Sequence, residues 1–120
     1  MISRLALALL PLVVAVGMPV TAQEPAQPMA CDIGPVKKTF GGTPWLVYGC
    51  SDGKSVVVIT AEGSPAMPFY FLFSPHAGSY RLNGEGTGNK ALTDAAFGEL
   101  SKLGSDDINK LFLETKTKAG

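Results

Sequence analysis

His76 is the single histidine of the 120-residue chain, and it is the first residue to consider for catalysis. A catalytic triad would bring it against a serine and a carboxylate, and residues of both kinds are present: Ser74, Ser79, Asp52 and Glu62. The residues around it, Pro75 to Gly78, are typical of an exposed turn. We therefore expect His76 to be a solvated loop residue that could contribute to binding, in a chain that is not an enzyme.

The stretch Gly84 to Lys90 (GEGTGNK) is the one segment that resembles a ligand-binding loop. Its candidate ligand residues are Gly86, Gly88, Asn89 and Lys90. The spacing matches neither a P-loop nor a dinucleotide fingerprint, and Glu85 has the wrong sign for phosphate. We favour a strand-to-helix connection in which Asn89 or Thr87 caps the helix, and a small carboxylate or sugar ligand remains the alternative.

Cys31 and Cys50 are the two cysteines, and in an oxidising compartment they are predicted to form a disulfide. Closing a loop of this length stabilises a domain by about 3 kcal/mol. Neither a Cys-x-x-Cys spacing nor a neighbour that would favour the thiolate indicates a redox role. With both cysteines paired and one histidine, no soft-ligand cluster remains, so we expect no metal and no cofactor.

The amino end has the pattern of a cleaved secretory signal at residues 1–22, with a basic start, an apolar run and a small-residue cleavage site. The apolar run is too short for a stable membrane span. A Pro- and Gln-rich lead at 23–30 is expected to be disordered, and a single small domain covers 31–118. The protein is therefore predicted to be periplasmic or secreted.

The chain has ten basic and ten acidic residues, and losing Arg4 with the signal leaves nine basic residues against ten acidic ones. A net charge this close to zero gives no reason to expect nucleic acid or an anionic membrane surface as a partner.

Short apolar runs separated by turn residues predict antiparallel strands, followed by a change to helical spacing after the glycines. We expect an α+β fold with a four- to five-stranded antiparallel sheet, built from two hairpins, and two C-terminal helices packed on one face. Ser105 is the expected N-cap of the second helix, with Asp106 and Asp107 in its first turn. The expected strands are at 45–50, 55–60, 69–73 and 80–82, with a weaker one at 36–40; the apolar stripes of the helices are Leu92, Ala96, Leu100 and Leu103, then Ile108, Leu111, Phe112 and Thr115.

Three of the expected strands are apolar on both faces, most clearly the run from Met67 to Phe73. Two short helices can cover only one face of the sheet. The other face could be covered by closure into a barrel, by the segment 31–40 folded back under the disulfide, or by another protein. The residues that could lie on a face without cover, depending on register, are Trp45, Val47, Tyr70 and Leu72. The candidate binding residues are Trp45, Tyr48, Tyr70 and Leu72, together with His76.

The sequence thus predicts a small exported protein that binds a protein or envelope component through an aromatic sheet face or the adjacent loops. One alternative is an inhibitor that inserts the 75–78 turn, with His76, into a secreted hydrolase. Another is a small ligand-binding protein or enzyme with a pocket near 84–90. A homodimer is compatible with each of these hypotheses.

Overall fold

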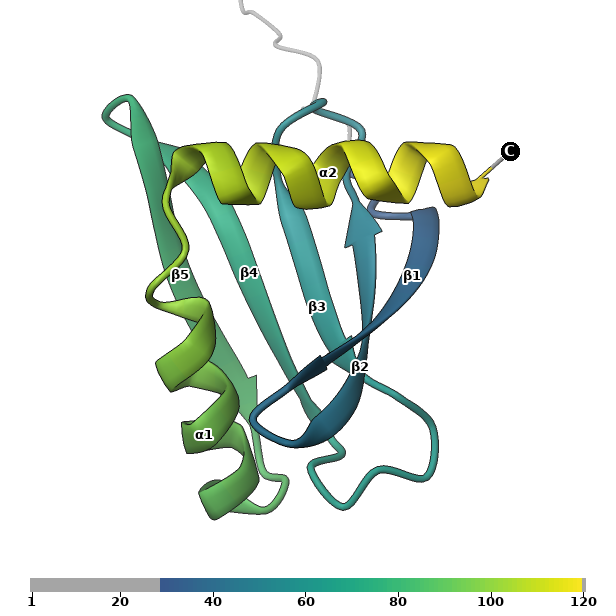
Figure 1. Cartoon of the computed structure of the whole chain (residues 1–120), viewed down its shortest axis with the longest axis vertical. Helices are drawn as coiled ribbons and strands as arrows, with labels where there is room; N and C mark the ends of the chain where they lie inside the picture. The colour runs from purple at the N-terminus through teal and green to yellow at the C-terminus, as the bar shows by residue number, and fades with distance from the viewer. Residues whose placement is uncertain (1–28, 120) are drawn as a thin grey trace, which may run out of the picture.

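The computed structural model describes residues 29–119, in which one five-stranded antiparallel sheet precedes two helices (Figure 1). The strands lie in the sheet in their order along the chain, which confirms the predicted α+β fold. The predicted signal at 1–22 and most of the predicted lead at 23–30 lie outside the described residues. The elements are β1 (Ile33–Phe40), β2 (Thr43–Gly49), β3 (Val56–Thr60), β4 (Phe69–His76), β5 (Ser79–Gly86), α1 (Lys90–Leu100) and α2 (Ser105–Ala119).

Strict alternation of buried and half-buried residues along β2 and β3 shows that the sheet has one covered face. The cross-strand register places Val47 opposite Val58, and Val58 opposite Phe71, so the buried residues of neighbouring strands form continuous rows. Burying such side chains stabilises the fold by about 1.5–3 kcal/mol each. The sheet residues of this core are Trp45, Val47, Val56, Val58, Phe71 and Phe73.

Trp45 belongs to the core and has no exposed surface. Its indole Nε1–H donates to the carbonyl of Phe40 and to the Thr43 hydroxyl, both at 3.0 Å. Its ring packs against Phe71 with 5.3 Å between centroids. Because the one polar atom of the side chain is satisfied within the fold, Trp45 is a core residue and is not available to a partner.

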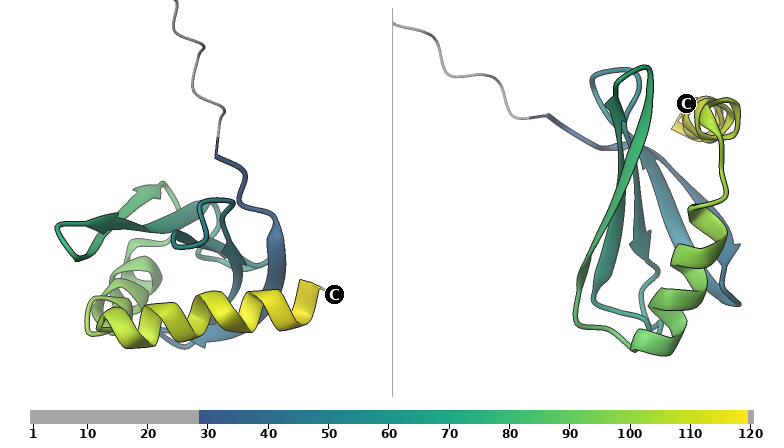
Figure 2. Two further views of the ribbon diagram at one scale, coloured as in Figure 1. Left: turned by 90° about the horizontal axis from the view of Figure 1, so that it is seen from above. Right: turned by 90° about the vertical axis from the view of Figure 1, so that its left-hand side faces the viewer.

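Both helices lie on the same side of the sheet (Figure 2, right). The amide N–H of Leu92 donates to the Asn89 side chain, which therefore caps α1, and Ala96 and Leu100 are buried against the strands. Helix α2 buries the predicted stripe. The predicted N-cap is wrong by one position, because Ser105 is itself the first helical residue. The Asp107 carboxylate accepts a hydrogen bond from the Gly104 N–H just before the helix. The stripe consists of Ile108, Leu111, Phe112 and Thr115.

The hairpin of β4 and β5 is longer than the sequence predicts. Strand β4 continues through Pro75 to His76, so the expected four-residue loop is a turn of two residues, Ala77 and Gly78, both with positive φ. Strand β5 runs on to Gly86 through glycines expected to be loop. A Cβ at Gly84 would lie 2.8 Å from the Phe71 ring, so the strand needs glycine there to pass beneath the aromatic side chain.

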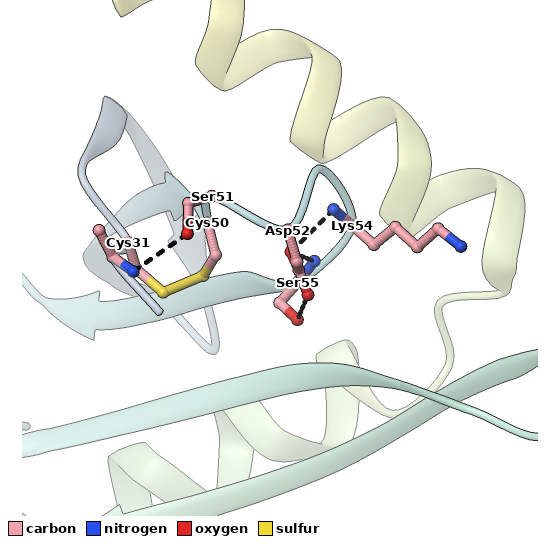
Figure 3. Close-up of a disulfide and its surroundings, with 7 residues drawn as sticks. Cys31, Cys50, Ser51, Asp52, Lys54 and Ser55 are labelled. Carbon is pink, nitrogen blue, oxygen red and sulfur yellow. Dashed lines mark hydrogen bonds between the residues drawn. A yellow bond between two sulfur atoms is a disulfide. The ribbon is translucent and has the colours of Figure 1, made fainter. Parts of the chain in front are cut away.

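The predicted disulfide joins Cys31, just before β1, to Cys50 at the end of β2 (Figure 3). Beside it, the Ala30 N–H donates to the Ser51 hydroxyl at 3.2 Å, and the Ser51 N–H donates to the Ala30 carbonyl at 2.6 Å. The disulfide and these two hydrogen bonds hold the beginning of the described chain against the end of β2.

Reduction of the disulfide, or the substitution Cys50→Ser, should lower the free energy of unfolding by about 3 kcal/mol, because the unfolded chain regains the freedom of a closed loop. Chemical denaturation with and without reductant measures this difference. Reductant should have no further effect on the Cys50→Ser variant, and equal stabilities of the oxidised and reduced protein would contradict a structural role.

The turn between β2 and β3 is held by the carboxylate of Asp52 (Figure 3). Its Oδ1 accepts from the backbone N–H groups of Lys54 and Ser55, at 2.9 and 2.7 Å, and its Oδ2 accepts from the Ser55 hydroxyl at 2.6 Å. Burial by itself would raise the pKa of Asp52, but the hydrogen bonds from Ser55 and Lys54 stabilise the ionised form and lower it.

Since the pKa of Asp52 is lower in the folded than in the unfolded state, its stabilising contribution is present above the unfolded pKa and is lost as pH falls through the folded pKa. Asp52→Asn should therefore lower stability at pH 7 by about 1 kcal/mol, allowing for screening at an exposed turn. It should also flatten the loss of stability below about pH 4. Urea unfolding of both proteins between pH 2 and 7 measures this, and parallel pH profiles would contradict it.

Candidate binding surface on the open sheet face

The sheet face opposite the helices carries six apolar side chains in two rows, which we call the open patch. In one row Leu46 pairs with Ile59 and Ile59 with Tyr70. In the other row Tyr48 pairs with Val57 and Val57 with Leu72. These residues alternate with the core residues along β2, β3 and β4, so their side chains point away from the helices. The open patch consists of Leu46, Tyr48, Val57, Ile59, Tyr70 and Leu72.

Residues 29–119 provide no cover for the open patch. Strands β1 and β5 are the two edges of the sheet and do not pair, so the sheet does not close into a barrel. The segment expected to fold back is the edge strand β1, paired with β2 in the plane of the sheet. Five of the six side chains are half-buried by their neighbours, and Tyr70 is 42% exposed. Both intramolecular explanations for the second apolar face are therefore wrong for the described part of the chain.

The open patch continues into a shallow groove of about 540 Å³ beside β4. Met67 is exposed in it, and its lining is predominantly apolar. The groove brings the side chains of the 67–68 connection next to those of Ile59 and Tyr70. The whole lining is Ile59, Thr60, Met67, Pro68, Phe69, Tyr70, Glu85 and Gly86.

Polar residues border the rows at the two edges of the sheet. Lys37 on β1 pairs with Leu46, Glu85 on β5 pairs with Tyr70, and Asn83 pairs with Leu72. The Tyr70 hydroxyl donates to Glu85 Oε1 at 3.2 Å. The negative charge of Glu85 and this hydrogen bond raise the pKa of Tyr70.

His76 lies at the end of β4, next to the tight turn of Ala77 and Gly78. Its Nε2 is 3.0 Å from Arg81 Nη2, and both side chains are exposed. No serine or carboxylate of the described chain is hydrogen-bonded to the imidazole, and residues 29–119 contain no group of three His, Cys, Asp or Glu residues that could hold a metal ion. The arrangement is that of a surface histidine, without the partners a catalytic base requires.

The glycine-rich candidate loop uses its backbone N–H groups within the fold. The amides of Thr87 and Gly88 both donate to the Pro68 carbonyl at 3.0 Å, and the amide of Asn89 donates to the Pro65 carbonyl at 3.2 Å. The Lys90 ammonium is paired with Asp94 at 3.3 Å. Gly86, Gly88, Asn89 and Lys90 thus form a packed connection from β5 to α1, with no set of free amides converging on one point.

Of the residues named from the sequence as a binding surface, Tyr48, Tyr70 and Leu72 lie together on the open face. His76 lies at the end of β4, near the tip of the β4–β5 hairpin. Trp45 and Val47, which were also expected as possible surface residues, lie on the covered face and are buried. Sequence reasoning missed Leu46, Val57 and Ile59 as members of the surface. Since both faces of these strands are apolar, only the cross-strand register identifies which alternate residues point outward.

No protein-family model matches the chain, and the searches of curated proteins and of solved structures found no match either. Neither helix of the described residues is long and apolar enough to cross a membrane. The function is therefore inferred from the surface itself.

Replacing Glu85 with glutamine should lower the pKa of Tyr70 towards the ordinary tyrosine value of about 10, since the neighbouring negative charge is removed. A pH titration of the ring resonances by NMR measures this shift. Tyr80 is an internal control, because its raised pKa results from burial and from Asp52 and should not move. An unchanged Tyr70 titration would contradict the contact.

Proposed function

We propose that this protein is a non-enzymatic interaction protein that is exported and binds a partner protein through the open patch. The observation that supports this most directly is the uncovered row of Leu46, Ile59 and Tyr70 beside that of Tyr48, Val57 and Leu72. A contiguous apolar patch that no other part of the fold covers is often an interaction site. Tyrosine is moreover enriched among the residues that dominate binding energy.

The dimensions of the open patch fit the centre of a protein interface. Three strands about 4.8 Å apart and two rows about 7 Å apart give a footprint of about 200 Å². A standard interface buries about 800 Å² on each partner, with an apolar centre and a polar rim. Lys37, Asn83 and Glu85 stand where that rim would lie.

The charges at the margins indicate the chemistry of the partner. Lys37 borders the open patch at the β1 edge and Glu85 borders it at the β5 edge. A complementary surface has apolar side chains at its centre, an acidic group facing Lys37 and a basic group facing Glu85. We therefore expect a folded protein with an amphipathic surface.

The disulfide supports a location outside the cytosol, since a cross-link between Cys31 and Cys50 persists in an oxidising compartment. Together with the secretory pattern at 1–22, it favours a periplasmic or secreted protein and a partner in the envelope or outside the cell.

A second candidate function is inhibition of a secreted hydrolase by the tip of the β4–β5 hairpin. Ala77 and Gly78 form a turn of two residues with φ of 50° and 79°, next to the exposed His76. Such a turn presents a narrow projection of little flexibility, which is the shape an active-site cleft accepts. The ligand pocket near 84–90 has less support, because the loop amides are bonded within the fold.

Site-specific photo-crosslinking in the producing cells tests the proposal. A photoreactive amino acid at Leu72 or Tyr70 should give a discrete cross-linked product with one partner. The same probe at Lys110, which is exposed on α2, should give none. Products from a probe at Ala77 alone would favour the inhibitor function, and products of equal yield from Lys110 would contradict a role for the open patch.

A matched pair of substitutions then measures how much the open patch contributes to binding. Leu72→Lys should weaken the binding of the cross-linked partner about 30-fold or more, the effect of losing one dominant contact. Leu113→Lys introduces the same change at a leucine of α2 that is 59% exposed, and should leave binding unchanged. Calorimetric titration gives the affinities, and thermal melts verify that both variants fold.

A further inference from the structure

Strand β5 forms a free edge of the sheet. It pairs with β4 along its whole length, and its other side meets no backbone hydrogen-bond partner within residues 29–119. Viewed from this edge, β5 runs along the near side of the sheet with both helices to one side (Figure 2, right). A strand of eight residues with unpaired N–H and C=O groups is a template for pairing with another strand.

The opposite edge, in contrast, has features that discourage pairing. Strand β1 contains Pro35, which has no amide hydrogen, and Lys37 and Lys38, which would repel a second copy. It also packs against α2, where the Lys38 ammonium lies 2.9 Å from the Glu114 carboxylate. Strand β5 contains no proline, and its two charged residues, Arg81 and Glu85, have opposite signs.

We propose that β5 pairs antiparallel with β5 of a second copy of the chain, with Asn83 on the twofold axis. Arg81 and Glu85 lie on the same face of the sheet, two residues to either side of Asn83. In this register each Arg81 stands opposite Glu85 of the other copy, so two cross-strand pairs of opposite charge form. Shifting the axis to residue 82 or 84 leaves both charges without an opposite partner, so the charge pattern selects one register.

The inner face of β5 is complementary to itself in the same register. Leu82 stands opposite Gly84 of the second copy, so a bulky residue meets one without a side chain. The ring of half-buried Phe69 lies over both Gly84 and Gly86, where a Cβ would come within 2.9 Å of it. Leu82 of the second copy would therefore meet an aromatic ring beside the glycine, a favourable cross-strand arrangement.

Such an assembly is a closed, isologous dimer with one continuous ten-stranded sheet. Because the twofold axis is perpendicular to the sheet, the helices of both copies lie on one side and both open patches on the other. The assembly does not rest on the proposed function, because it forms through the free backbone edge of β5 and involves none of the six residues of the open patch, only Asn83 and Glu85 of its rim.

Charge-reversal variants of the full chain test the dimer by analytical ultracentrifugation over a range of concentrations. The unmodified protein should show a reversible monomer–dimer equilibrium. Arg81→Glu or Glu85→Arg alone places like charges opposite each other twice per dimer, and should raise the dimer Kd about 10-fold or more. Combining the two substitutions in one chain restores opposite charges and should recover dimerisation.

A mixture of the two single variants is the most specific test of the register. In a heterodimer of Arg81→Glu with Glu85→Arg, both cross-strand pairs have opposite charges, so mixing should restore the dimer that each variant alone lacks. Lys37→Glu, a charge reversal on the other edge strand, should have no effect, and circular dichroism should show that all variants fold. A protein that stays monomeric at millimolar concentration, single variants that dimerise normally, or a mixture that stays monomeric would overturn the proposal.

Discussion

Packing of the two helices against one face of the sheet is the constraint on which the other features of this fold depend. The contact of Trp45 with Phe71 beneath α1 and α2 fixes which alternate residues of β2, β3 and β4 point inward. With that choice made, Leu46, Ile59 and Tyr70 must point outward, because side chains along a strand alternate between its faces. The helices are too few to cover a second face. The open patch is thus a direct consequence of how the core is filled.

Much of the architecture could be predicted from the sequence, since its signals are local. The stripe of α2 repeats at helical spacing, and the two cysteines of the chain have only each other as partners for an intramolecular disulfide. The choice between the two faces of the strands could not be predicted, because Trp45 and Tyr48 are both apolar enough for a core. Hydrogen bonds from the indole to Phe40 and Thr43 stabilise one assignment, and these arise only when the β1–β2 hairpin has formed.

The sequence also predicts too short a strand β5, because glycines can occur either in a loop or in a closely packed strand. In a sequence, Gly84 and Gly86 indicate a loop, because glycine has low strand propensity. In the fold they lie in a strand beneath the rings of Phe69 and Phe71, where any larger residue would collide. Gly49 has a similar place, since a Cβ there would approach the Phe112 ring to 2.9 Å. At Gly49, Gly84 and Gly86, therefore, the missing side chain permits close packing against an aromatic ring.

Helix α2 runs across the upper end of the sheet in Figure 1 and makes most of its strand contacts with β1 and β2. Each strand of the sheet pairs with the strand next to it in the sequence, so the sheet can form from local contacts. Its core side chains remain exposed to water until Ile108 and Phe112 of α2 pack against them. A chain growing on the ribosome, or emerging from a translocation pore, would hold the C-terminal segment back longest. The domain would then acquire its stable form only after the residues of α2 have been released and can pack against the sheet.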